Sequence, residues 1–349
     1  MAYTWPDVLT GLVSGENLSS QAAVWAMDEI LAGNATDVQL AGFLVALRAK
    51  GETVDEIAGL AEAMRDRATP ITLDAEAVDV VGSGGDRANT VNVSTMAAVV
   101  AAAAGARVVK HGNRAASSAC GAADCLEALG VALNVPPDRQ PAVLAEAGIV
   151  FLFAPLYHPS LRHAATARRE LGIQTPFNFL GPLANPARPA AQAVGIANER
   201  MAALVAGVLA RRGTRGMVFH GDDGLDELTT TTTSDIWLIS DGEVRTASLD
   251  PADLGFARAG HADLVGGGVA HNAAVARRVF AGEAGPIRDI VVLNAAAALL
   301  AYHRPSLERD LTEQLAGHVA SAASAIDSGA ATAVLDTWVT VSRRLAEPA

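Results

Sequence analysis

The first 70 residues carry hydrophobic side chains at the spacing of amphipathic helices. Between residues 41 and 47 apolar positions recur every three or four residues, which places them on one helix face. Two helix starts are marked by capping-box pairs, Thr36 with Gln39 and Thr53 with Glu56. No strand pattern appears in this segment, which is therefore predicted to be helical, with helices over residues 20–33, 36–50 and 53–64.

After residue 70 the pattern changes to short apolar runs that alternate with helical periods. Such alternation is typical of a mainly parallel sheet with helices on its faces, so an α/β class is predicted. A hairpin is expected at residues 236–239 and 244–248, because Asp241-Gly242 suits a tight turn. The other predicted strands are residues 77–81, 107–110, 148–153, 192–196 and 216–220. The predicted helices are residues 91–104, 122–129, 163–171, 201–211, 272–281, 287–303, 311–328 and 330–345.

Composition narrows the class of protein. The chain has 349 residues, half of them hydrophobic, and a formal net charge of −12. An acidic chain argues against binding to nucleic acid or to a membrane surface, which needs a basic face. The longest apolar stretch, residues 96–104, is too short to span a bilayer, and no signal peptide is apparent. Cys120 and Cys125 form no disulfide framework or metal motif and indicate reduced thiols in a cytoplasmic protein.

A glycine-rich loop, residues 82–86 (Gly-Ser-Gly-Gly-Asp), follows the first predicted strand. Glycine lets the backbone turn tightly and approach a ligand, so the loop can present N–H groups to an anion. It matches neither the dinucleotide-binding nor the P-loop pattern. The alternative is a tight turn without a ligand, and the loop alone does not decide between the two.

Two further segments favour phosphate. Residues 92–95 (Asn-Val-Ser-Thr) open a predicted helix, whose N-terminal N–H groups and dipole attract anions, although ordinary N-capping is the commoner role. Lys110 and Arg114 follow the second strand, where ligands of open α/β sheets bind. The alternative for both is a solvated charge on a loop. His111 between them is a candidate proton carrier or a packed histidine.

Acidic and basic residues elsewhere could complete such a site. Asp226 and Glu227 are adjacent carboxylates after the strand at 216–220, and Mg²⁺ typically takes one or two carboxylates plus ligand phosphates. A solvated acidic turn is the alternative. Arg168 or Arg169 could pair with a substrate carboxylate through two parallel hydrogen bonds. Surface arginines are the alternative there.

Taken together these motifs resemble the anthranilate phosphoribosyltransferase family. The resemblance rests on residues 82–86, 92–95 and 110–114, on Gly-Ala-Ala-Asp at 121–124, and on Glu-Ala-Leu-Gly at 127–130. Phe-Asn-Phe-Leu-Gly-Pro-Leu at 177–183 and the Asp226-Glu227 pair complete it. It covers nearly the whole chain in order, and the motifs are specific as a set although each alone is weak.

The resemblance implies transfer of a phosphoribosyl group from phosphoribosyl pyrophosphate to the amine of anthranilate, in tryptophan biosynthesis. It implies a small all-helical domain, residues 1–70 plus about 161–188. A large α/β domain with a mainly parallel sheet, residues 71–160 plus 189–349, binds phosphoribosyl pyrophosphate. It also implies two Mg²⁺ per active site and a homodimer formed through the helical domain.

The family's functional residues carry over to positions of this sequence that match its motifs. Lys110 would act electrostatically, and no acid or base is assigned. The metal would be held by Ser94, Asp226 and Glu227, and anthranilate by Gly82, Asn113, His158 and Arg168. The phosphoribosyl pyrophosphate contacts implied are Gly82, Gly85, Asp86, Thr90, Asn92, Val93, Ser94, Thr95, Lys110, His111, Gly112, Asn113, Arg114, Ala115, Ala116, Ser117, Ser118 and Ala122.

Three positions depart from the family pattern, and three alternative functions are open. Ser83 stands where the family usually has Thr, and Cys120 and Ala122 stand where Ser is frequent, which puts one side-chain phosphate contact in doubt. A pyrimidine nucleoside phosphorylase has a similar fold but a Lys-His-Ser-type first loop that this chain lacks. A nucleic-acid-binding paralogue should carry a basic groove. A non-catalytic binding protein for phosphorylated sugars would not need the Asp226-Glu227 pair.

Overall fold

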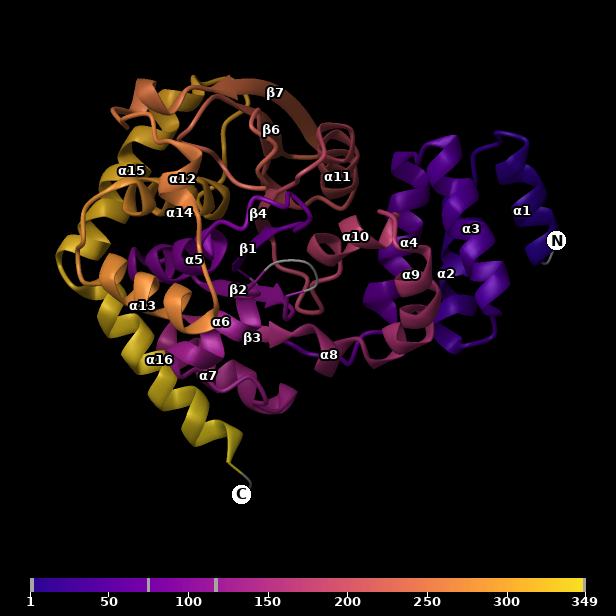
Figure 1. Ribbon diagram of the computed structural model, residues 1–349, viewed down its shortest axis with the longest axis horizontal. Helices are drawn as coiled ribbons and strands as arrows, with labels where there is room; N and C mark the ends of the chain where they lie inside the picture. Colours follow the sequence, from indigo (N-terminus) through magenta and orange to yellow (C-terminus); the bar gives the residue numbers. More distant parts are fainter. Residues whose placement is uncertain (1–2, 74–75, 116–118, 348–349) are drawn as a thin grey trace.

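The chain folds into a helical bundle at one end and a layered α/β unit at the other (Figure 1). The computed structural model describes residues 3–73, 76–115 and 119–347. None of the helices in these ranges is both long and apolar enough to cross a membrane. The bundle contains α1 (Trp5–Val13), α2 (Ser20–Ala32), α3 (Asp37–Lys50), α4 (Val54–Asp66) and, from much later in the chain, α9 (Ala165–Leu171).

A seven-stranded sheet forms the centre of the α/β unit, in the order β3-β2-β1-β4-β5-β6-β7. The first five in this order pair in parallel, whereas β6 and β7 are antiparallel and form the hairpin predicted from the sequence. The parallel prediction is therefore confirmed for the part of the sheet that faces the site. The strands are β1 (Val78–Gly82), β2 (Val108–Gly112), β3 (Ile149–Phe153), β4 (Ala191–Gly195), β5 (Arg215–Gly221), β6 (Ser234–Ser240) and β7 (Glu243–Leu249).

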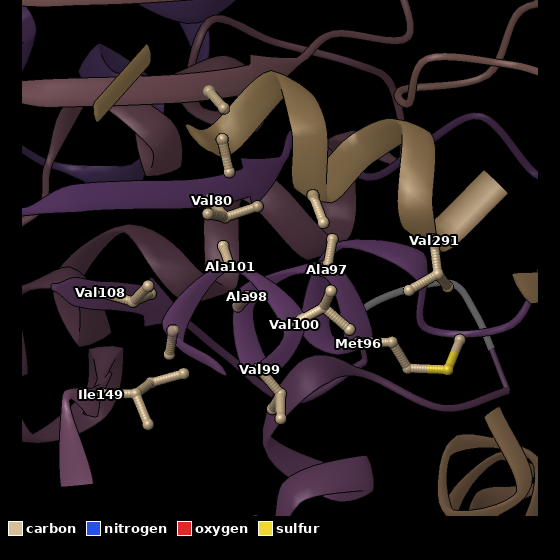
Figure 2. Packing of buried hydrophobic residues seen from close by; sticks show 14 of the residues in the cluster. Val80, Met96, Ala97, Ala98, Val99, Val100, Ala101, Val108, Ile149 and Val291 are labelled. Carbon is tan, nitrogen blue, oxygen red and sulfur yellow. The ribbon is translucent and has the colours of Figure 1, made fainter. Parts of the chain in front are cut away.

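The helices of the α/β unit cover the sheet. α5 lies between β1, β2 and α14, and Figure 2 shows its residues Met96 to Ala101 packed among Val80, Val108, Ile149 and Val291. Small alanines let this helix approach its neighbours closely. The helices are α5 (Val93–Ala103), α6 (Ala122–Leu129), α7 (Gln140–Ala147), α8 (Ala154–Tyr157), α11 (Glu199–Arg211), α12 (His261–Leu264), α13 (Val269–Phe280), α14 (Pro286–Tyr302), α15 (Leu311–Asp327) and α16 (Ala330–Ala346). The short α10 (Phe177–Leu180) lies between the sheet and the bundle and contacts α4.

The elements differ from the sequence predictions at few places. Both capping boxes form as predicted, at Thr36 and Thr53. The helix expected from residue 91 begins at Val93, because the N–H of Val91 donates to Leu264 and Thr90 bridges to Val265. The predicted helix ranges include none for α1, α7, α8 or α12, and α10 lies inside a segment expected to be irregular.

A second hydrophobic cluster joins the bundle to the α/β unit. It contains core residues of α1 to α4 and of the 164–184 segment, and continues through α11 to Val194, Val218 and Trp237 on the sheet. The bundle is therefore packed against α11 by an apolar contact, and the candidate site opens beside this junction.

Candidate active site

A cavity of about 400 Å³ lies where the parallel strands end. Its walls come from the loops after β1 and β2, from the start of α5, from the segment after β5, and from the bundle side through Met64 and Arg168. Open α/β sheets bind ligands at the carboxyl ends of their strands, so the cavity is in the expected place.

The glycine-rich loop after β1 packs directly on the acidic segment. Gly84 and Gly85 adopt φ of 70° and 89°, which favours glycine. The N–H of Gly84 donates to Oδ2 of Asp226 at 2.6 Å. Ser83, one of the departures from the family pattern, donates through Oγ to the Gly84 carbonyl and accepts from the N–H of Ala197. The loop is thus tied to the segment just after β4 and to the carboxylate of Asp226.

The start of α5 does not use an ordinary N-cap. Asn92 makes no capping hydrogen bond; its amide donates to the Cys120 carbonyl at 3.0 Å and accepts from Asn272 at 3.0 Å. The N–H of Ser94 donates to Glu227 at 3.1 Å. Oγ1 of Thr95 is buried without a hydrogen-bond partner among the described residues. An unpaired buried hydroxyl on the cavity wall is a group that a polar ligand could satisfy.

Lys110 is buried at the base of the cavity. Its Nζ donates to the Val80 carbonyl and, at 3.3 Å, to Oγ of Ser94. Burial lowers the pKa of Lys110, and Asp79, Glu227 and Asp226 oppose this shift. An ammonium held among carboxylates in this way is the fixed positive charge that a phosphate group requires.

Asp226 and Glu227 are both nearly buried, at 8% exposure each. Burial and the neighbouring Asp86 raise the pKa of Asp226 to about 7. Burial and Asp226 raise the pKa of Glu227 well above its usual value. Lys110 offsets the charge of these crowded carboxylates only in part, so the pair favours a further cation.

These residues fit a magnesium site completed by ligand atoms. Among the described residues no group of three or more His, Cys, Asp or Glu side chains is placed to hold a metal ion. Mg²⁺ usually takes only one or two carboxylates from the protein and the rest of its shell from phosphates and water. Asp226 and Glu227 supply that number, with the hydroxyl of Ser94 nearby.

The bundle side of the cavity presents Arg168 and an aromatic surface. The Arg168 guanidinium lies 5.2 Å from the centre of the Phe177 ring. Burial lowers the pKa of Arg168, and no carboxylate in the described part of the chain pairs with it. An unpaired guanidinium beside an aromatic ring is suited to a planar aromatic carboxylate.

Two histidines lie at the junction of the walls. The rings of His111 and His158 meet edge to face at 5.2 Å, and His158 donates to the Ala184 carbonyl at 2.9 Å. Burial and His158 lower the pKa of His111 to about 3, so its ring is neutral. Its Nε2 has no hydrogen-bond partner among the residues described. His111 is therefore a packed neutral ring with one nitrogen left for a ligand.

Comparison with known proteins identifies this arrangement. Residues 74–332 match the glycosyl transferase family, a/b domain, and residues 6–68 match its helical bundle domain. The chain is 57% identical over 341 residues to the anthranilate phosphoribosyltransferase of Nocardioides sp., covering 98% of this chain and 99% of that relative. It is 58% identical over 340 residues to that of Arthrobacter sp., covering 97% and 96%. The chain belongs to the anthranilate phosphoribosyltransferase family.

Solved structures of anthranilate phosphoribosyltransferases share the fold. The enzyme of Thermus thermophilus superposes with a TM-score of 0.89 at 42% identity, over 97% of this chain and 99% of that one. The Saccharomyces cerevisiae enzyme in complex with PRPP and Mg gives 0.87 at 26% identity, over 97% and 98%. The fold class and family predicted from the motifs are confirmed.

The described residues that the family resemblance assigned to ligands all line the one cavity. Their individual contacts with anthranilate phosphoribosyltransferase substrates stay predictions, and Ala116, Ser117 and Ser118 lie outside the described residues. Those on the cavity wall are Gly82, Gly85, Asp86, Thr90, Asn92, Val93, Ser94, Thr95, Lys110, His111, Gly112, Asn113, Arg114, Ala115, Ala122, His158, Arg168, Asp226 and Glu227.

The Arg114 side chain forms ion pairs within the protein and is not free to bind a phosphate. Its guanidinium pairs with Asp124 at 2.8 Å and Glu127 at 2.9 Å. Asp124 also accepts from the N–H groups of Ala115 and Gly121, both at 3.0 Å. The side chain of Arg114 thus fastens its loop to α6, and its backbone is the part left to face a phosphate.

Sequence reasoning missed a buried polar group beneath Lys110. Asp79, in β1, accepts from the N–H of His111 at 3.2 Å and from the amide of Asn185 at 2.9 Å. The same amide donates to the Val109 carbonyl at 2.9 Å. Burial raises the pKa of Asp79 to about 6. A lone Asp inside a strand pattern was the one signal available.

Proposed function

We propose that this protein transfers the 5-phosphoribosyl group of phosphoribosyl pyrophosphate to the amine of anthranilate, releasing pyrophosphate, as a step of tryptophan biosynthesis. The observation that carries the proposal is the division of one cavity into two halves. A buried cation and carboxylates, Lys110 with Asp226 and Glu227, lie on one side, and the unpaired Arg168 guanidinium beside Phe177 lies on the other.

The donor half would hold the diphosphate. Backbone N–H groups of the 82–86 loop and the start of α5, with Lys110, would bind its oxygens. Asp226, Glu227 and Ser94 would hold Mg²⁺, with two ions in each active site. When bound, this metal would neutralise charge that develops on the departing pyrophosphate. Lys110 would add its fixed charge at the same place.

The acceptor half would orient anthranilate. Arg168 would pair with the anthranilate carboxylate, and Asn113, Gly82 and His158 would border the ring. An aromatic amine is unprotonated at neutral pH, so no strong general base is required. The amine nitrogen would form a bond to the anomeric carbon as the bond from that carbon to pyrophosphate breaks, with inversion and loss of the amine proton. Positioning of the two reactants supplies much of the rate enhancement.

Exclusion of water from the active site would depend on closure between two domains of the chain. We infer that residues 1–70 with 161–188 form a helical domain that closes on the α/β domain, residues 71–160 with 189–349. Arg168 lies on the first and Lys110 on the second. Closure would bring both halves of the site together and keep water, the competing nucleophile, away from the sugar.

We also infer that the protein is a cytoplasmic homodimer joined through the helical domain. Val13 of α1 and Val38 of α3 are 79% and 82% exposed, which leaves apolar surface on the bundle. Light scattering should give the mass of a dimer for the wild type and of a monomer for Val38→Glu. Val244→Glu, at a 39% exposed valine of β7 in the α/β unit, should stay dimeric. A monomeric wild type would refute this inference.

The activity is tested by the fluorescence of anthranilate. With phosphoribosyl pyrophosphate and Mg²⁺, purified protein should consume anthranilate, and omission of Mg²⁺ should stop the reaction. No loss of fluorescence under these conditions would overturn the proposal. Phosphate-dependent cleavage of a pyrimidine nucleoside by the same sample would instead indicate the phosphorylase alternative.

A further inference from the structure

A second cavity, of about 250 Å³, lies away from the candidate active site. It is located where the bundle helices α2 and α4 meet α11 of the α/β unit, and it shares no lining residue with the larger cavity. The lining residues are Ser20, Ala58, Glu62, Arg65, Asp66, Arg188, Val208, Arg211 and Arg212.

The wall of this cavity is basic, in contrast with the acidic chain as a whole. Four guanidinium groups face two carboxylates there. Arg188 pairs with Asp66 at 2.6 Å, and Arg211 pairs with Asp55 outside the cavity. In the described ranges neither Arg65 nor Arg212 has an ion-pair partner. Glu62 and Asp66 lie near both guanidinium groups, but they form no ion pair with either one, so they offset the charge of Arg65 and Arg212 only in part.

Arg212 is the least satisfied of these groups. Its Nη1 donates to the Leu183 carbonyl at 2.9 Å, whereas its Nη2 is buried and has no hydrogen-bond partner among the described residues. Burial and the adjacent Arg65 lower the pKa of Arg212 to about 9. A buried charged N–H without an acceptor is costly, so a bound anion would remove a specific deficit.

We propose that this cavity is a binding site for a small oxyanion of the phosphate class. The N–H groups of a guanidinium are spaced to donate two parallel hydrogen bonds to phosphate oxygens. Arg65 and Arg212 line the cavity from two different elements of its wall. Ser20 is the first residue of α2, so the positive end of that helix dipole is adjacent. The ligand is free inorganic phosphate or the phosphoryl group of a larger metabolite, which share this chemistry.

The position of the site gives it a mechanical consequence. Arg65 belongs to α4 in the matched helical bundle domain, and Arg212 follows α11 in the matched a/b domain. A single anion bound by both would fasten the two domains together at their apolar junction. This inference does not depend on the transfer reaction, because none of its residues belongs to the candidate active site.

Calorimetric titration of the full-length protein with inorganic phosphate at constant ionic strength tests the site. Phosphate that binds in the larger cavity should do so equally in all variants. A difference between the isotherms of the wild type and a variant therefore reports on the second cavity. We expect the phosphate Kd of the second site to rise about tenfold or more in Arg212→Gln and in Arg65→Gln, the loss of a charge-assisted hydrogen bond. Arg344→Gln, an exposed arginine paired with Glu146, should bind like the wild type.

Identical isotherms for the wild type and both cavity variants would overturn the proposal. So would a response to phosphate that sodium chloride of equal ionic strength reproduces. If Arg212→Gln does not fold, Arg65→Gln is decisive, because it leaves the hydrogen bond from Arg212 to the Leu183 carbonyl in place. The source of the ligand is resolved by titration with a sugar phosphate: equal affinity indicates a metabolite, and binding of inorganic phosphate alone indicates the free ion.

Discussion

The backbone N–H of Gly84 donates to the carboxylate of Asp226 at 2.6 Å, across 142 positions of the chain. Two glycines make this contact possible. A methyl group on Gly82 would lie 2.3 Å from Oδ2 of Asp226, and one on Gly195 would lie 1.7 Å from its backbone oxygen. The acidic segment is therefore seated on the ends of the adjacent strands β1 and β4. The distance between the proposed metal ligands and the phosphate loop is fixed by backbone packing.

Gly195→Ala should displace this segment. Because the added methyl group meets backbone rather than a flexible side chain, we expect a loss of at least about 2 kcal/mol in the free energy of unfolding. Activity should fall with it. Gly317→Ala is the matched control, since nothing lies within 4 Å of the added atom. Denaturant titration of both variants measures the difference; equal stability would contradict the packing argument.

Asp226→Asn should change how stability depends on pH in metal-free protein. The pKa of Asp226 is raised from 3.8 to about 7 in the folded state, so the folded protein holds this proton more tightly than the unfolded chain. The associated stability is present below about pH 4 and lost as pH rises to about 7, an upper limit of ~4 kcal/mol.

Asparagine keeps an acceptor for Gly84 but does not titrate. The variant should therefore gain stability relative to the wild type between pH 4 and pH 7, as measured by urea titration at several pH values. Mg²⁺ should stabilise the wild type more than the variant at pH 8. A constant difference across this range would show that Asp226 does not titrate as described.

Arg168→Ala should raise the KM for anthranilate about tenfold to a hundredfold, the range expected for a lost charged hydrogen-bond pair. The KM for phosphoribosyl pyrophosphate should change little, because the donor half is on the other wall. Arg169→Ala, an exposed neighbour on the same helix, is the control. Equal effects on both substrates would remove the role given to Arg168.

Asn185→Leu should destabilise the buried hydrogen-bonded pair of Asp79 and Asn185 near Lys110. It leaves Asp79 and the Val109 carbonyl without the amide that serves both, at a cost of about 1–3 kcal/mol in the free energy of unfolding. Because Asp79 also supports the charge of Lys110, the KM for phosphoribosyl pyrophosphate should rise. Exposed Asn34→Leu should change stability by less than about 0.5 kcal/mol. Thermal unfolding and initial rates check both expectations.

The sequence predicted most of the framework because its signals are local. The capping boxes at Thr36 and Thr53, the glycine-rich turn at 82–86 and the Asp241-Gly242 hairpin each depend on residues a few positions apart. The helix over residues 140–147 was missed, since its eight residues are mostly apolar and show no clear alternation between an apolar and a polar face.

The site was predictable only in part, because several of its contacts join distant positions. Lys110, Arg168 and Asp226 stand out by charge in motifs. The contact of Asp79 with Asn185 and that of Gly195 with Asp226 leave no such signal in the sequence. Each contact forms only because the fold brings distant strands and loops together. The pairing of Arg114 with Asp124 and Glu127 likewise follows from where α6 lies relative to its loop.

The strand order has a consequence for synthesis on the ribosome. β1 lies between β2 and β4, and the chain passes through β2, β3 and the bundle helix α9 before β4 is made. Until residue 195 has emerged, one edge of Val78–Gly82 stays unpaired, and an unpaired apolar edge promotes association between chains. While residues 83–195 are being translated, the nascent chain therefore exposes a strand edge that the finished fold covers with β4.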